Sequence, residues 1–422
     1  MQRKPNRRAC AGESHPNETK VYKGKMSTTS KLKTALFKSA SRRIRQAWSA
    51  RDGACPPVKR RSWTGPSAIL KAASVLYEKG LRKDQAKLLK RQVRLPVPVI
   101  SIGNVSVGGT GKTPLTIRMC EFLIEIGYHP AVLTRGYGGR GKSPGRIPPL
   151  LDEPLAELFG DEPVMMSEYL PSTPVWVGSD RAASGRAALE EGGVDVLVLD
   201  DGFQHLALHR DLDIVLLDCR DPFGNGLVLP AGPLREPPSS LQRADVFVIT
   251  HAARNGEAAR LRSRLQSLFP SIASFASNHT LRGIRIEKGG PLLPPSLLSG
   301  LKAVAFAGIA TPESFFEDIR RAGIEVCESL DFPDHHRYTS EDLLQVFGSA
   351  SKHKAALLVT TAKDSARLPA FLKSIFAVAE IGIDFGPDSG DFRSFLENRL
   401  KKDSDHGQDR PPGVPETGGK KI

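Results

Sequence analysis

Apolar and polar residues follow two different periods along this chain, and their order predicts an α/β fold. From residue 97 onward, short β-branched apolar runs alternate with stretches in which apolar residues recur every three or four positions. The first pattern is typical of buried strands and the second of helices packed on one face, so together they indicate a parallel sheet. The expected strands lie at 97–102, 131–133, 175–177, 194–199, 214–217 and 246–249, with a second series at 303–307, 324–326 and 356–359.

A glycine-rich turn joins the first expected strand to the first helix of this series. Its residues are Ser106, Val107, Gly108, Gly109, Thr110, Gly111, Lys112 and Thr113. Glycines let backbone N–H groups converge on phosphate oxygens, and a helix N-terminus adds partial positive charge. Strand, turn and helix together predict a nucleotide-binding P-loop, with Lys112 at the β- and γ-phosphates and the Thr113 hydroxyl on Mg²⁺.

Two adjacent carboxylates, Asp200 and Asp201, follow the apolar run 194–199. In P-loop proteins a carboxylate at such a strand end accepts from the Mg²⁺ shell. Neighbouring side chains on a strand point to opposite faces. We therefore expect one carboxylate to serve the metal and the other to contact a substrate or a supporting residue.

Other charged residues are placed where the loops of a parallel sheet meet. Arg135, Arg181 and Arg235 follow expected strands. Asp161 lies near the start of a helix, and His335 precedes a helix of the second series. Loops after parallel strands gather along one edge of the sheet, where ligands bind. Several arginines at that edge suit an anionic, multiply phosphorylated acceptor.

Composition divides the chain into four segments. Residues 1–63 are expected to be a basic presequence or disordered, and 64–284 to be a P-loop NTPase-like parallel sheet domain. A proline-rich stretch near residue 291 marks a junction, so 285–400 is expected to be a second, smaller α/β domain. The Lys-, Asp-, Gly- and Pro-rich residues 401–422 are expected to be a disordered tail.

The net charge of +14 belongs to the N-terminal segment alone. Residues 1–62 contain 17 Lys and Arg against 3 Asp and Glu, so the remaining residues are neutral overall. This distribution argues against a nucleic-acid partner, because the folded part has no basic field. Residues 26–61 are rich in Ser, Lys and Arg with Asp52 as the only acidic residue, which is typical of a mitochondrial transit peptide, with the chloroplast as alternative. A basic tail without a targeting role is also open.

The stretch 67–91 predicts one amphipathic helix with an apolar stripe and many Lys and Arg residues. Such a helix can lie at a membrane surface. The alternative is a helix packed on the core with solvated lysines. No apolar run approaches the ~18 residues that a membrane-spanning helix needs.

Taken together, the motifs resemble the tetraacyldisaccharide 4′-kinase family, the lipid A 4′-kinases. Ser106, where the general P-loop pattern has glycine, is typical of that family. The matching stretches appear in the family's order at 103–114, 135–139, 160–163, 200–205, 223–226, 229–235 and 334–335.

The resemblance implies an enzyme that transfers the γ-phosphate of ATP to the 4′-hydroxyl of a tetraacyl-diglucosamine 1-phosphate lipid. The product is the 1,4′-bisphosphate, lipid IVA, and the cofactor is Mg²⁺. The family takes its glycolipid substrate from a membrane surface, and no specific protein partner is inferred. With the basic N-terminus, this implies a peripheral protein of the inner mitochondrial membrane.

The resemblance also implies roles for the individual residues. Asp161 would act as base on the sugar hydroxyl, assisted by His335, and Lys112 would stabilise the transferring charge. Thr113 and Asp200 would hold the metal. The residues expected to contact the acceptor or the nucleotide are Arg135, Arg181, Asp201 and Arg235.

A second class of function remains open from the residues alone. The run Gly108–Thr113 also occurs in P-loop NTPases that switch between states to bind a protein partner. Such a switch needs neither the collection of arginines nor the helix at 67–91. These features favour the kinase.

Overall fold

The fold comes from a computed structural model. It describes residues 67–136, 145–148, 155–252, 256–286, 290–309, 311–368, 372 and 374–405. The expected presequence at 1–63, its transit signal and residues 406–422 lie outside the described residues.

The first sheet has eight strands in the order β3-β4-β2-β5-β1-β6-β7-β8, all parallel except for the β3–β4 pair. Alternate residues of β5 enter two different cores, with Val196 and Val198 on one face and Leu197 and Leu199 on the other. Burial on both faces explains the continuous apolar runs. The strands are β1 (Val99–Asn104), β2 (Pro130–Thr134), β3 (Gly145–Arg146), β4 (Val175–Val177), β5 (Val196–Asp200), β6 (Leu212–Asp218), β7 (Val246–Thr250) and β8 (Ala273–Ala276).

Helices accompany this sheet, and their starts agree with the sequence pattern. α2 matches the helix expected at 67–91, and α5 begins at Asp161 as expected. No helix among the described residues is long and apolar enough to cross a membrane. The helical segments are α2 (Ala68–Lys90), α3 (Lys112–Glu125), α4 (Leu155–Phe159), α5 (Asp161–Tyr169), α6 (Arg181–Glu191), η1 (Pro238–Arg243) and α7 (Glu257–Leu268).

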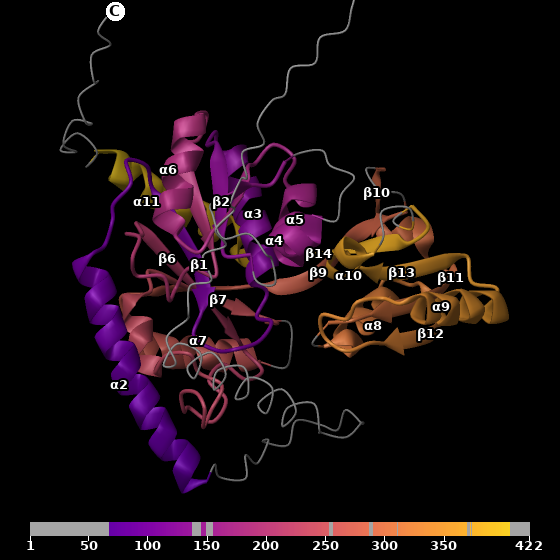
Figure 1. Ribbon diagram of the computed structural model, residues 1–422, viewed down its shortest axis with the longest axis horizontal. Coiled ribbons are helices and arrows are strands. Elements are labelled where there is room, and N and C mark those ends of the chain that lie inside the picture. Colours follow the sequence, from indigo (N-terminus) through magenta and orange to yellow (C-terminus); the bar gives the residue numbers. More distant parts are fainter. Residues whose placement is uncertain are drawn as a thin grey trace, which may run out of the picture. The chain divides into compact units, whose positions relative to one another are not determined.

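The second sheet has six strands in the order β10-β9-β14-β13-β11-β12, and β9 runs antiparallel to both of its neighbours. Helices α8 and α9 pack on this sheet (Figure 1). Its strands are β9 (Asn278–Arg285), β10 (Leu292–Leu293), β11 (Lys302–Ala307), β12 (Glu325–Asp331), β13 (Leu357–Thr361) and β14 (Ala377–Asp384). Its helical segments are η2 (Pro295–Leu298), α8 (Pro312–Arg321), α9 (Ser340–His353) and α10 (Ala362–Arg367).

All nine strands expected from apolar runs are present, which confirms the α/β class. The pattern missed β3, β8, β9, β10 and β14. β3 and β10 have two residues each, β8 and β9 are mostly half-buried and lack a continuous apolar run, and Glu380 and Gly382 interrupt the apolar run of β14. β9 starts at Asn278, two residues after β8 ends, so the second sheet begins slightly before residue 285. The division into domains at residue 285 stays a prediction.

The last helix returns to the core of the first sheet. After η4 (Gly386–Asp388), α11 (Ser389–Asp405) contributes Phe392, Leu396 and Leu400 to the cluster that contains Ile102 of β1. In Figure 1 this helix, in yellow, lies among the purple elements of the first sheet. Residues 401–405, expected to be part of a tail, are thus helical.

Candidate active site

The glycine-rich turn lies between β1 and α3, at the carboxyl end of a central strand. Gly108 and Gly111 have φ angles of 131° and 88°, in the region that favours glycine. A Cβ at Gly111 would also lie 2.3 Å from Nε2 of His279, so a larger residue does not fit there. Asn104 Nδ2 donates to Thr110 Oγ1 at 3.0 Å and supports the turn from β1. This geometry agrees with the expected P-loop.

Lys112, the first residue of α3, points its ammonium group towards Asn104 and Asp201. Its Nζ lies 3.3 Å from Asn104 Oδ1 and 3.5 Å from Asp201 Oδ1. Burial lowers the pKa of Lys112, while the carboxylate of Asp201 opposes that shift. Thr113, the second residue of the helix, is buried directly beside it.

The two adjacent carboxylates have different partners, but not because side chains alternate along the strand: β5 ends at Asp200, and Asp201 already lies in the turn that follows. Asp200 ends β5 and accepts hydrogen bonds from the hydroxyls of Thr116 and Thr134, each at 3.2 Å. Burial raises the pKa of Asp200 to about 6, and the nearby carboxylates of Glu162 and Asp201 add to the shift. A carboxylate in such surroundings is poised to receive a cation.

Asp201 has the opposite electrostatic surroundings. Its φ of 52° turns the chain out of the strand. The side chain lies 2.8 Å from Nη1 of Arg235 and 3.5 Å from Lys112. Although burial alone raises the pKa of Asp201, the two cations outweigh burial and lower it.

The donor set at the P-loop fits Mg²⁺. A hydroxyl and a carboxylate, Thr113 and Asp200, are hard oxygen ligands, and Mg²⁺ in nucleotide sites takes few protein ligands and fills the rest with phosphate and water. No group of three or more His, Cys, Asp or Glu residues that could hold a metal occurs in the described part of the chain. The Asp200 carboxylate is buried and accepts its hydrogen bonds from hydroxyl groups, so a cation would offset its buried charge.

A pocket of about 220 Å³ gathers the four residues that were expected to contact a substrate, namely Arg135, Arg181, Asp201 and Arg235. Three further residues line it that were not assigned from the sequence: Ser179, Gln204 and His205. Burial, together with the charge of Arg181, lowers the pKa of His205 to about 4, so its imidazole is neutral at physiological pH. Gln204 and His205 belong to the run that starts at Asp200, and this adjacency was the signal that could have identified them.

Asp161 meets two side chains from the connections of the second sheet. His335 Nδ1 lies 3.2 Å from Asp161 Oδ2, and Arg367 donates to the same oxygen from Nε at 2.9 Å and Nη2 at 2.5 Å. Burial alone raises the pKa of Asp161, but these hydrogen bonds and the charge of Arg367 hold it well below its usual range. The contact with Asp161 in turn raises the pKa of His335. Arg367 was not expected, because nothing in the sequence signals a contact across 206 positions.

The expected residues therefore form two clusters. One joins the P-loop to the pocket through Lys112, Asp201 and Arg235. The other contains Asp161 and His335. Among the contacts of the described residues, no hydrogen bond or ion pair links Asp161 directly to Lys112 or Asp200.

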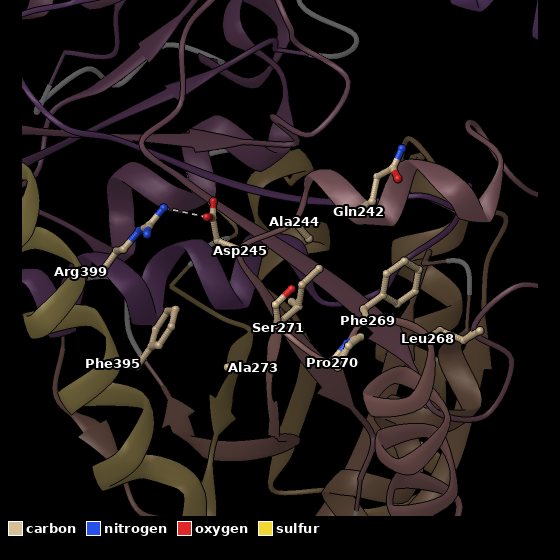
Figure 2. Close-up of a pocket in the computed structure, with 11 residues that line it drawn as sticks. Gln242, Ala244, Asp245, Leu268, Phe269, Pro270, Ser271, Ala273, Phe395 and Arg399 are labelled. Carbon is tan, nitrogen blue, oxygen red and sulfur yellow. Dashed lines mark hydrogen bonds and ion pairs between the residues drawn. The ribbon is translucent and has the colours of Figure 1, made fainter.

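A larger cavity, of about 500 Å³, lies elsewhere (Figure 2). Ala244 and Asp245 directly precede β7, and Ala273 begins β8, so this cavity lies at the amino ends of these strands. Phe395 and Arg399 of α11 close it from the side. Ligands of parallel sheets bind at the carboxyl ends of strands, and none of the expected site residues lines this cavity. It is therefore not the candidate active site.

A P-loop after a central parallel strand, with a carboxylate at the end of the neighbouring strand and a basic pocket beside it, defines a P-loop phosphotransferase. Comparison with known proteins gives the family. The family model described as tetraacyldisaccharide-1-P 4′-kinase matches residues 66–401, and the chain belongs to this family.

Curated relatives agree over most of their length. The chain is 43% identical to the tetraacyldisaccharide 4′-kinase of Syntrophobacter fumaroxidans over 380 residues, covering 89% of this chain and 98% of the relative. It is 43% identical to the protein of the same name from Syntrophus aciditrophicus over 335 residues, 73% and 88% of the two chains. A crystal structure of LpxK from Aquifex aeolicus in complex with ATP is similar, with a TM-score of 0.62, 29% identity, and coverage of 78% of this chain and 98% of that one. The chain is thus a kinase with the P-loop NTPase-like fold.

Proposed function

We propose that the chain transfers the γ-phosphate of ATP to the 4′-hydroxyl of a tetraacyl-diglucosamine 1-phosphate lipid. The observation that carries this proposal is the ion-pair chain Lys112–Asp201–Arg235. It links the nucleotide loop to a pocket lined by three arginines, which suits an acceptor that already bears a phosphate. A switch that acts on a protein partner does not need such a pocket.

The nucleotide is held by the P-loop from Ser106 to Thr113. Backbone N–H groups of the turn and the start of α3 donate hydrogen bonds to phosphate oxygens. Lys112 neutralises charge on the transferring group. Thr113 and Asp200 hold Mg²⁺, which supplies further charge neutralisation when bound. Asp201 and Arg235 hold Lys112 on the side of the pocket.

The acceptor hydroxyl is oriented by Asp161. Its carboxylate is ionised at physiological pH, so it can accept a hydrogen bond from the hydroxyl and take its proton. His335 contacts the same carboxylate and assists. Arg135, Arg181 and Arg235 bind the acceptor's phosphate or the nucleotide.

The helix α2 places the enzyme at a membrane surface. Ile69 and Leu76 are 79% and 70% exposed, and basic side chains accompany them along the helix. Tyr77 of α2 donates to the backbone carbonyl of Arg235 at 3.0 Å, which docks the helix beside the pocket. An apolar and basic helix next to the acceptor site suits a substrate that is drawn from a membrane.

A cellular address is part of the same proposal. The transit-like residues 26–61 favour peripheral attachment to the inner mitochondrial membrane, with the chloroplast as alternative. The relatives named above are bacterial. A fluorescent protein fused behind residues 1–63 tests the address, and diffuse fluorescence in a eukaryotic cell would contradict it.

Transfer from γ-labelled ATP to a detergent-dispersed tetraacyl-diglucosamine 1-phosphate lipid tests the reaction. We expect label in the lipid with the wild-type enzyme and with Lys302→Ala, which removes an exposed lysine on the second sheet. We expect none with Lys112→Ala. ATP loss that is indifferent to the lipid would favour the switch.

A further inference from the structure

Arg367 holds Asp161 more closely than any other side chain at this cluster. Its Nε and Nη2 both donate to Oδ2 of Asp161, at 2.9 and 2.5 Å. Oδ1 accepts from the backbone N–H of Glu162 at 3.1 Å. Only 9% of the Arg367 side chain and 11% of the Asp161 side chain are exposed, so water screens this pair poorly.

Arg367 is itself held in place from the second sheet. Its Nη1 donates to the carbonyl of Gly308 at 3.0 Å and to Asp364 Oδ1 at 3.1 Å. Asp364 is fixed in turn, because it accepts from the Thr361 hydroxyl at 2.6 Å and from the Gly308 N–H at 3.1 Å. A guanidinium group with all these partners has one orientation, and it transmits that orientation to Asp161.

Arg367 also contacts the other partner of the carboxylate. Its Nη2 lies 3.2 Å from Nδ1 of His335, which itself approaches the same oxygen of Asp161. The guanidinium therefore sets the place of the imidazole as well. Asp161, His335 and Arg367 form one unit in which the arginine is the best anchored member.

We propose that Arg367 is a positioning residue of the phosphoryl-transfer site, which fixes the Asp161 carboxylate in one orientation together with His335. The inference rests on the proposed function, in which Asp161 orients the acceptor hydroxyl. A cation on the base reduces its basicity. In a loose phosphoryl-transfer transition state the hydroxyl needs placement more than early deprotonation, so a weak but fixed base serves the reaction.

A purely structural contact is the alternative explanation, and the molecule offers a matched control for it. Lys363, on the same helix α10, pairs with Glu162, the neighbour of Asp161. This pair also joins α10 to α5, but Lys363 has no hydrogen bond with Asp161. If these contacts only hold α10 against α5, loss of the Arg367 charge and loss of the Lys363 charge have the same consequence.

The test compares Arg367→Met, Arg367→Lys and Lys363→Met with the wild-type enzyme, after thermal unfolding has shown that each variant folds. The charged groups around Asp161 are His335 and Asp334 from the segment after β12, Lys363, Asp364 and Arg367 from α10, and Glu162 from α5. Titration of Asp161 is followed by NMR of carboxyl-¹³C-labelled aspartate, assigned with Asp161→Asn. Steady-state transfer rates are measured at pH 7.5.

For Arg367→Met we expect the midpoint of Asp161 to rise by about 1–3 pH units, because a cation is lost. At pH 7.5, where Asp200 is ionised in all variants, kcat falls by about ten- to a hundred-fold with little change in the KM for ATP. Arg367→Lys recovers part of kcat. Lys363→Met leaves kcat and the midpoint of Asp161 near their wild-type values.

Two results overturn the inference alone: transfer undiminished in Arg367→Met, or an equal loss of kcat in Lys363→Met with the midpoint of Asp161 unmoved in both variants. Wild-type enzyme that binds ATP but phosphorylates no lipid overturns the proposed function, and the inference with it. The kinetic comparison thus separates the two failures.

Discussion

Asp200 and Asp201 are neighbours in the chain, but they differ in what their surroundings do to their charge. Asp200 is buried among hydroxyls, and its pKa is raised to about 6. Asp201 lies between Lys112 and Arg235, and its pKa is lowered. The strand ends between them, and the positive φ of Asp201 directs its side chain to the cations. This one change in backbone direction gives the two carboxylates different partners.

Because the carboxylate of Asp200 is buried, we predict that removing its charge stabilises the fold and weakens nucleotide binding. Because burial raises its pKa in the folded state, Asp200 destabilises the fold progressively as the pH rises from about 4, the pKa of an unfolded aspartate, through about 6. In EDTA, Asp200→Asn should raise the free energy of unfolding at pH 8 by about 1–3 kcal/mol and by clearly less at pH 4. Urea unfolding at both pH values measures this. The same variant should lose Mg²⁺-dependent nucleotide affinity, and unchanged affinity would contradict the metal assignment.

For Asp161 we predict that removing the charge slows phosphoryl transfer but leaves nucleotide binding intact. Asp161→Asn keeps the shape of the side chain but removes the charge that accepts the proton. We expect kcat for lipid phosphorylation to fall by about 10²–10⁴-fold. The dissociation constant of ATP, measured by calorimetry, should stay near the wild-type value because Asp161 has no contact with Lys112. Full activity would show that another group is the base.

At the scale of elements, α2 is a helix with one side packed on the protein and another side exposed. Ser74 is buried and donates to the carbonyl of Val228 at 2.9 Å, while it accepts from Ala231 N at 2.9 Å. The exposed Ile69 and Leu76 lie seven positions apart, two helical turns along the same face. Local pattern therefore defines the apolar face, but the contacts of Ser74 and Tyr77 decide which side of the helix stays open.

This arrangement predicts that α2 binds membranes. Ile69→Asp combined with Leu76→Asp should weaken binding to anionic phosphatidylglycerol vesicles by more than about tenfold, because two exposed aliphatic side chains no longer enter the bilayer surface. Vesicle flotation measures the bound fraction. Leu297→Asp, which changes an equally exposed leucine in η2, is the control. Equal flotation of all three proteins would leave α2 without a membrane role.

At the scale of the whole molecule, the last helix of the described chain closes the core of the first sheet. Phe392 of α11 stacks on Phe385 with ring centroids 4.2 Å apart and meets Phe122 of α3 edge-on at 5.9 Å. The core of the first sheet is therefore completed by a helix that follows the second sheet in the chain. This connectivity couples the C-terminal helix to the helix that carries the P-loop.

The coupling predicts a large effect of one distant side chain on stability. Phe392 is fully buried, so Phe392→Ala should lower the free energy of unfolding by about 3–5 kcal/mol. Circular dichroism in a urea titration measures the change. Leu297→Ala, at an exposed position, should change stability by less than about 0.5 kcal/mol. A small effect of Phe392→Ala would mean that α11 is not part of the first core.

Much of the site was predictable because its residues lie in local patterns. The P-loop, Asp200, Asp201 and the arginines follow strands whose apolar runs are unmistakable, and parallel strands bring their carboxyl ends to one edge. The pocket then combined Arg135, Arg181 and Arg235 as expected. Gln204 and His205 join them through the turn after Asp201. The roles of Arg135, Arg181 and Arg235 in the reaction stay predictions.

The sequence by itself determined the α/β class, the phosphate-binding turn and the family, since each depends on periodicity and on motifs within a few residues. Only the tertiary structure decided that Arg367 meets Asp161, that α11 returns to the first sheet, and which face of α2 stays exposed. These contacts join positions far apart in the chain, across 206 residues for Arg367 and Asp161. Such contacts depend on how whole helices and strands pack together, and the pattern of neighbouring residues does not contain that information.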